Sequence, residues 1–105
     1  MEIVKDAYSV SKGFPKQETF GLNQQMRRCS ISIPSNIAEG FNRFHNKEYL
    51  QFLYIALGSG AELETQLEIA FKLNYVNLES KNLLLEKINH ESRMLTSLIN
   101  KIRNS

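Results

Sequence analysis

The chain has 105 residues, of which 42% are hydrophobic and 23% charged, a composition typical of one small globular domain. Its 13 Lys and Arg residues against 11 Asp and Glu give a net charge of +2, which permits a nucleic-acid partner without arguing for one. A single cysteine excludes an intramolecular disulfide, and no apolar run reaches the roughly 20 residues that a membrane helix needs. We therefore expect one domain over residues 1–105, in the cytoplasm and without a membrane partner.

The first predicted helix is short. Its apolar residues recur at gaps of four, three and four, which places them on one helical face: Ile3, Ala7, Val10 and Phe14. Gly13 and Pro15 are helix-stop residues and end it after about 11 residues. So short a first helix is expected to leave part of the groove between its neighbours uncovered.

The second predicted helix opens at Glu18 or Thr19 and runs for about 24 residues. Its apolar stripe includes Leu22, Met26, Cys29, Ile33, Ile37 and Phe44. Pro34 lies inside it, removes one backbone donor and presses on the carbonyl of Ser30, at a cost of about 3 kcal/mol. The helix either stops near Ile33 or kinks and continues. Because the stripe keeps its register beyond the proline, we predict a kinked, continuous helix.

Polar side chains surround this proline: Ser30, Ser32, Ser35 and Asn36. Such side chains can bond to backbone groups that a proline loosens, so we interpret them as local backbone repair. The alternative is a binding surface. Farther along the same helix, Glu39 precedes Arg43 by four residues, the favourable order for an ion pair.

The third predicted helix carries a heptad seam: Tyr49, Leu53, Ala56, Gly60, Leu63, Leu67 and Ala70. Asn46 is a better N-cap for it than His45. Gly58 and Gly60 each cost about 1 kcal/mol relative to alanine in a helix interior. We therefore expect both glycines to face a close neighbour, most simply the second helix at Pro34.

The fourth predicted helix follows a turn over residues 74–77, with Asn77 at its start. Its apolar residues again recur at gaps of three and four: Leu84, Leu85, Ile88, Leu95, Leu98, Ile99 and Ile102. No alternating pattern of the kind that strands show competes with this interpretation. The sequence therefore predicts an all-α fold, an antiparallel up-down-up-down four-helix bundle with a short first helix.

Several motifs in the second and third helices resemble those of a known family. They are Arg27-Arg28, residues 32–40 (SIPSNIAEG), Lys47-Glu48-Tyr49 and residues 62–67 (ELETQL). These motifs resemble the four-helix-bundle proteins encoded by intervening sequences inside large-subunit ribosomal RNA genes, a family similar to the accessory protein of diversity-generating retroelements. The resemblance covers most of the chain between Phe14 and Tyr75. It implies a four-helix bundle, a pentameric barrel, and RNA or DNA as a partner.

The residues offer no catalytic or metal-binding constellation. A di-iron bundle needs Glu-x-x-His pairs, and neither His45 nor His90 has a glutamate three residues before it. Cys29 lies on the apolar stripe, which suits a small core residue better than a nucleophile. Glu62 and Glu64 point to different sides of a helix, so we interpret them as solvated or intersubunit side chains. We expect no enzyme, no cofactor and no metal.

Two kinds of interface remain as candidates. The candidate nucleic-acid-binding residues are Arg27, Arg28, Arg43 and Lys47. Phosphate binding needs clustered cations, but Arg28 and Arg43 lie about 22 Å apart along a helix, so ion pairs are the alternative. The candidate oligomer interface consists of Arg28, Glu39, Phe52, Ile55 and Glu62. It rests on surplus apolar residues that one small core cannot hold: Phe52, Ile55, Leu57, Phe71 and one of Leu84 or Leu85.

Two functions follow as hypotheses. The first is a homo-oligomeric, non-enzymatic accessory protein that associates with RNA or DNA, as the resemblance implies. The second is a protein–protein interaction scaffold that binds no nucleic acid.

Overall fold

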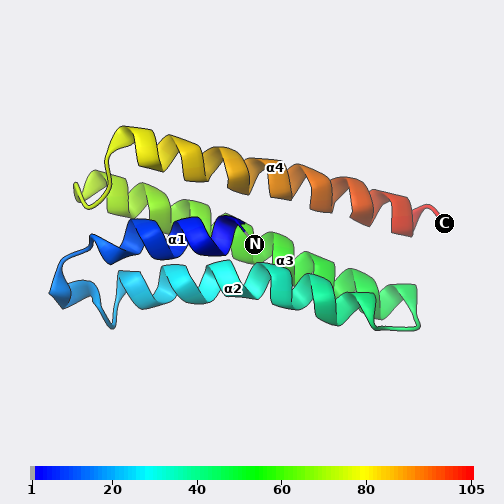
Figure 1. Ribbon diagram of the computed structural model, residues 1–105. Coiled ribbons are helices and arrows are strands. Elements are labelled where there is room, and N and C mark those ends of the chain that lie inside the picture. Colours follow the sequence, from blue (N-terminus) through cyan, green and yellow to red (C-terminus); the bar gives the residue numbers. More distant parts are fainter. Residues whose placement is uncertain (1) are drawn as a thin grey trace.

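The computed structural model describes residues 2–105, and these residues form the predicted four α-helices. The helices are α1 (Glu2–Lys12), α2 (Leu22–Phe41), α3 (Asn46–Lys72) and α4 (Leu78–Arg103), with a short 3-10 helix, η1 (Lys16–Glu18), between the first two. Successive helices run in opposite directions along one long axis (Figure 1). The fold is therefore the predicted up-down-up-down helical bundle, measuring 46 × 24 × 18 Å.

The bundle has four helices over part of its length and three over the rest. Each helix packs on the one before it, and α1 also contacts α4. However, α1 has 11 residues and α3 has 27. The N-terminus consequently lies near the middle of the bundle, while α2, α3 and α4 continue past it (Figure 1). The predicted short first helix is confirmed.

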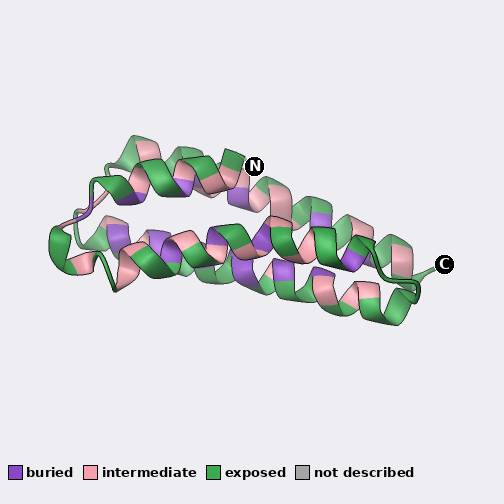
Figure 2. Ribbon diagram, turned by 60° about the horizontal axis from the view of Figure 1, so that its bottom comes forward, coloured by how far each residue is buried: buried purple, intermediate pink, exposed green. Residues whose placement is uncertain are grey.

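The hydrophobic core follows this division. Its larger cluster lies where all four helices meet and consists of Phe14, Met26, Ile33, Leu63, Leu67, Ala70, Leu84 and Ile88. A smaller cluster joins α3 to α4 at the three-helix end: Leu53, Ala56, Leu95 and Ile99. Buried residues accordingly lie on the inward sides of the helices (Figure 2). The predicted heptad seam of α3 is confirmed, since every member except the half-buried Tyr49 is buried.

The start of α2 differs from the prediction. The helix begins at Leu22, not at Glu18 or Thr19, because residues 16–18 form η1. The Glu18 carboxylate accepts hydrogen bonds from two groups outside this 3-10 helix. Its Oε1 accepts the backbone N–H of Leu22 at 3.4 Å, and its Oε2 accepts the hydroxyl of Tyr75 at 2.9 Å. One carboxylate thus tethers both the start of α2 and the α3–α4 turn.

The predicted continuation of α2 through Pro34 is confirmed, and the predicted kink stays a prediction. The hydroxyl of Ser30 donates to the carbonyl of Arg27 at 2.7 Å, and the Asn36 amide donates to the carbonyl of Ser32 at 2.8 Å. Both side chains bond to nearby backbone carbonyls, but neither of these is the Ser30 carbonyl that Pro34 leaves without its donor, so the repair of that group stays a prediction. The Ser32 hydroxyl additionally lies 2.7 Å from that of Ser59 on α3. The polar residues around Pro34 hold α2 together and also attach it to α3.

The prediction for the glycines of α3 is wrong in two respects. Gly58 is exposed, and a Cβ placed there would meet nothing within 4 Å. Gly60 is buried, but a Cβ placed there would lie 3.5 Å from Oγ of Ser92 on α4, so its neighbour is α4 and not α2 at Pro34. The close approach of α2 and α3 is at Gly40, where a Cβ would lie 2.9 Å from the Cβ of Phe52. Gly40 lies next to the short α2–α3 turn, which forces the two backbones together there.

Of the predictions for the starts of α3 and α4, the first is wrong and the second is confirmed. His45, not Asn46, occupies the N-cap position of α3, and its side chain makes no capping bond. Asn77 caps α4 as predicted, because its Oδ1 accepts the N–H of Ser80 at 2.7 Å. Within residues 2–105, no helix is both long enough and apolar enough to cross a membrane.

Candidate functional site

The predicted nucleic-acid-binding residues do not form one site. Arg27 is used within the molecule: its Nε donates to the Ser11 hydroxyl at 2.8 Å, and its guanidinium carbon lies 4.5 Å from the centre of the Tyr8 ring. These contacts attach α2 to α1. The adjacent Arg28 is exposed and diverges from Arg27 by about 100° around the helix.

The other two predicted cations lie at the far end of α2. Arg43 forms the predicted ion pair with Glu39, at 3.6 Å, and its guanidinium lies 4.8 Å from the centre of the Phe52 ring. Lys47 is exposed in the first turn of α3. Arg43 therefore forms an ion pair, which was the alternative to phosphate binding. The four predicted cations are divided between the two ends of the bundle.

A polar cluster joins α2 to α3 near Arg28. The Cys29 thiol donates to Oε2 of Glu62 at 3.4 Å and accepts the Nε2 N–H of Gln66 at 3.4 Å. Partial burial raises the pKa of the Cys29 thiol above its ordinary value of 9.0, and the Glu62 carboxylate raises it further. A thiol that stays protonated is a poor nucleophile, which supports the structural interpretation of Cys29.

The predicted interface residues lie beside the line where α2 meets α3. Four of them are exposed: Arg28 and Glu39 on α2, and Ile55 and Glu62 on α3. Ile55 is 50% exposed although it is apolar. Phe52 is half-buried beneath Arg43. These residues can contact a second subunit, and their role in assembly stays a prediction.

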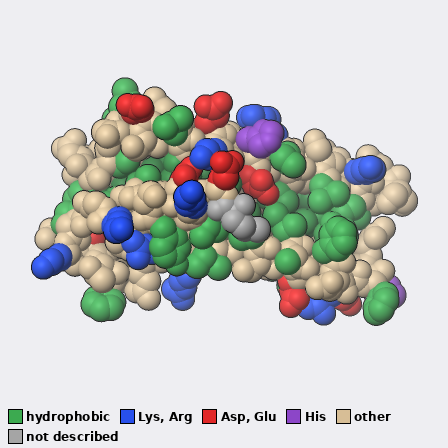
Figure 3. Space-filling model, in the orientation of Figure 1, with side chains coloured by type: hydrophobic (Ala, Val, Ile, Leu, Met, Phe, Trp, Pro, Cys, Tyr) green, Lys and Arg blue, Asp and Glu red, His purple; other side chains and the backbone are tan. Residues whose placement is uncertain are grey.

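A groove lies beyond the N-terminal end of α1, where a short first helix was expected to leave its neighbours uncovered. It encloses about 790 Å³ between α2 and α4. Its apolar wall is formed by α2 and includes Ile33, Pro34, Ile37 and the 75% exposed Phe41. Hydrophobic side chains are visible there to the right of the N-terminus (Figure 3). The α4 side of the groove is polar and includes His90, Glu91 and Arg93.

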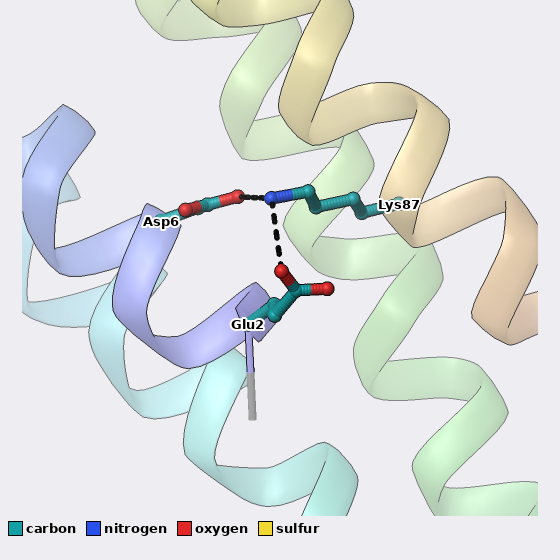
Figure 4. Close-up of polar contacts among 3 residues, drawn as sticks. All are labelled: Glu2, Asp6 and Lys87. Atoms are coloured by element: carbon teal, nitrogen blue, oxygen red, sulfur yellow. Dashed lines mark hydrogen bonds and ion pairs between the residues drawn. The ribbon is translucent and has the colours of Figure 1, made fainter.

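Charged residues close the end of this groove that adjoins α1. Lys87 of α4 forms an ion pair with Asp6 of α1 and a second one, at 3.9 Å, with Glu2 (Figure 4). The hydrogen bond to Asp6 raises the pKa of Lys87 above its ordinary value of 10.5. The ammonium group therefore stays charged under ordinary conditions and attaches α1 to α4.

A second hollow, of about 670 Å³, lies at the corner formed by α1, η1 and the start of α2. We call it the basic hollow, and its principal lining residues are Tyr8, Lys12, Lys16, Phe20, Arg27 and Arg28. The turn at residues 13–15 ends α1 and places η1 beside the first turns of α2, which brings these residues together. Several Lys and Arg side chains lie over this part of the molecule, at the left of Figure 3.

Sequence reasoning missed three residues of the basic hollow: Lys12, Lys16 and Phe20. They belong to separate segments with no shared periodicity, so only the folding of the turn between α1 and α2 brings them near Arg28. The usable signal was the pair of lysines on either side of Gly13 and Pro15. Among residues 2–105, no three His, Cys, Asp or Glu side chains gather as metal ligands would.

Comparison with known proteins finds a matching family and a similar solved structure. A family model described as 23S rRNA-intervening sequence protein matches residues 1–97. A solved structure from Bacteroides thetaiotaomicron, described as a protein with unknown function from the S23 ribosomal protein family, is similar in fold. The two share 23% sequence identity with a TM-score of 0.86, over 94% of this chain and 89% of the other. No curated protein matches the sequence.

Proposed function

The chain belongs to the 23S rRNA-intervening sequence protein family, and from this premise we propose that it is a non-enzymatic accessory protein that associates with nucleic acid and assembles with itself. The family match over residues 1–97 is the observation that carries the proposal. We place the protein in the cytoplasm, where a half-buried lone cysteine such as Cys29 stays reduced.

The surface chemistry supports association with nucleic acid. Lys12, Lys16 and Arg28 form no ion pair within residues 2–105, so their charges are available to phosphate groups. The net charge of +2 is small, and binding therefore has to rest on this local concentration of cations rather than on the whole surface. Affinity of this kind depends strongly on salt.

The exposed apolar residues support self-assembly. Ile55 on α3 is 50% exposed, and α3 is the helix that packs most extensively on α2. A cyclic arrangement would cover such residues on every subunit without leaving a free edge. The family resemblance implies a ring of five subunits.

Fluorescence anisotropy with labelled RNA oligonucleotides, measured between about 50 and 200 mM salt, tests the nucleic-acid association. We expect binding that weakens as salt increases, with a linear dependence of log affinity on log salt. Absence of binding to RNA and DNA at the lowest salt concentration would contradict the proposal.

The α2–α4 groove favours a second candidate function, an interaction scaffold for another protein. Grooves with an apolar wall and a polar rim are typical of sites that receive a partner's helix. RNA binding can be compared between the unmodified protein and variants with substitutions in this groove. If the substitutions leave RNA binding unchanged, the groove is not the RNA site and can serve a protein partner.

A further inference from the structure

We propose that the basic hollow binds single-stranded nucleic acid, with an unpaired base stacked on Phe20 and the flanking phosphates held by Lys12, Lys16, Arg27 and Arg28. This inference rests on the proposed nucleic-acid association and assigns it a site and a strand type. The site differs from the predicted one, because it excludes Arg43 and Lys47 and adds residues of α1 and η1.

The charge of the hollow is of one sign. Four cationic residues line it, and among the described residues that line it none is acidic. The nearest acidic residue in the sequence, Glu18, is not among the lining residues, and its carboxylate accepts the N–H of Leu22 and the hydroxyl of Tyr75. An anionic backbone can therefore approach these cations without meeting a negative group in the lining.

Arg27 is held in position before any ligand arrives. Its Nε is bonded to Ser11 and its guanidinium lies over the Tyr8 ring, so the plane of the guanidinium is set by α1. Its remaining N–H groups make no hydrogen bond within residues 2–105. A fixed, planar guanidinium suits two-pronged recognition of a phosphate, and little side-chain entropy remains to be lost on binding.

Phe20 provides the argument for an unpaired base. Its side chain is 88% exposed, lies at the rim of the hollow and packs on no other aromatic ring among the described residues. Exposed aromatic rings beside cations are the arrangement that single-strand-binding proteins use, because each base has a flat face that can stack. A duplex hides those faces inside its own stack, so it could use the cations but not Phe20.

The volume of about 670 Å³ admits a nucleotide together with water. The partly exposed Ile31 extends the lining along α2 beyond Arg28 and gives an apolar surface for a neighbouring sugar or base. The base would stack on Phe20, a sugar or a neighbouring base would contact Ile31, and the phosphates would contact the four cations.

The test compares matched single-residue variants. Phe20→Ala removes the stacking ring, and Phe44→Ala removes an equally accessible phenylalanine at the opposite end of the bundle, where the side chain is 99% exposed. Neither ring contributes to the core, so both variants should fold, which circular dichroism checks. Anisotropy is measured with labelled single-stranded RNA, single-stranded DNA of the same sequence, and duplex RNA.

We expect Phe20→Ala to weaken single-strand binding roughly 5- to 150-fold, the loss typical of one base stack, and to leave duplex binding unchanged. Phe44→Ala should bind like the unmodified protein. The RNA and DNA strands decide which sugar the site accepts. Tighter binding of the duplex than of either single strand would overturn the inference.

Charge is tested in the same way. Lys12→Gln/Lys16→Gln should lower the slope of log affinity against log salt by about 1.4, or 0.7 for each lost phosphate contact. The control Lys72→Gln/Lys101→Gln removes the same charge elsewhere and should leave the slope unchanged. If the unmodified protein binds single strands but the Phe20 and lysine variants match their controls, the site is wrong and the proposed function stands. If the unmodified protein binds no nucleic acid, both fail.

Discussion

Gly40 is the glycine at which an added carbon would disturb the packing most. A Cβ there would lie 2.9 Å from the Cβ of Phe52 and 2.9 Å from Cδ1 of Tyr49. The Cβ of Phe52 is fixed by its own backbone, so α2 or α3 must move to make room. The glycine of the motif SIPSNIAEG is therefore explained by the close contact of two helices.

We expect Gly40→Ala to lower the free energy of unfolding by about 1–3 kcal/mol, the usual cost of overpacking. Gly58→Ala is the matched control, because Gly58 faces open space in the middle of α3. There alanine should raise the free energy of unfolding by about 0.5–1 kcal/mol, through its better helix propensity. Denaturant titration measures both, and equal effects of the two substitutions would contradict this account of Gly40.

Tyr75 gives a pH-dependent prediction at the same scale. Its hydroxyl donates to Glu18, and this bond raises the pKa of Tyr75 above the ordinary value of 10.0. The folded protein thus holds the proton more tightly than the unfolded chain. The contribution to stability is complete below pH 10.0 and is lost as the pH rises through the raised pKa.

Tyr75→Phe removes only the hydroxyl and keeps the ring, which lies 5.4 Å from that of Phe14. We expect the variant to have a lower Tm than the unmodified protein near neutral pH, and the difference to shrink above about pH 10. Thermal melts across that range provide the measurement. A difference that is constant with pH would show that the Glu18 bond is not its source.

At the scale of the elements, α1 is held by polar contacts in addition to its apolar face. It is the shortest helix, with 11 residues, and its ties include the ion pairs of Lys87 with Asp6 and Glu2 and the bond from Arg27 to Ser11. A short helix is marginal in water without tertiary contacts, so α1 should open more readily than α3 or α4.

Lys87→Gln should therefore increase amide hydrogen exchange within α1 while leaving exchange in the middle of α3 unchanged. Both ion pairs of Lys87 depend on its positive charge, and glutamine carries no charge. Lys5→Gln is the control, because Lys5 is exposed on α1 and forms no ion pair within residues 2–105. Exchange that rises equally in both variants would mean that the ion pairs do not hold α1.

At the scale of the whole molecule, the exposed apolar surface bears on assembly. The bundle leaves large apolar side chains exposed on several helices, among them Phe41, Tyr54, Ile55, Ile69, Leu83 and Met94. Single exposed apolar residues are common, but residues on the neighbouring α2 and α3 surfaces can form a continuous contact. We propose that this surface is where subunits meet.

We expect light scattering after size exclusion to give a mass that is a multiple of 12.1 kDa, and five subunits if the ring is correct. Ile55→Asp should reduce that mass by placing a charge in the contact. Leu78→Asp is the control, since Leu78 is similarly exposed, at 55%, but lies at the start of α4. A 12.1 kDa particle at micromolar concentration would contradict self-assembly, and a dimer would contradict only the ring.

The sequence by itself determined the helices and the faces that they bury. The apolar residues at gaps of three and four in α1, α3 and α4 are buried or half-buried, and α2 is continuous through Pro34 because its stripe keeps register. The motifs around Pro34 also placed the chain in its family. These properties depend on neighbours within a turn or two of the helix, so a local pattern is sufficient to predict them.

Tertiary structure alone decided which residues meet. It selected Gly40 rather than Gly58 for the close helix contact, engaged Arg27 with α1, and assembled the basic hollow from three segments. Each of these contacts depends on how one helix is rotated against another and on where a turn ends one helix and the next begins. Periodicity records which face of a helix is apolar, but it contains no information on the distance between polar residues of different segments.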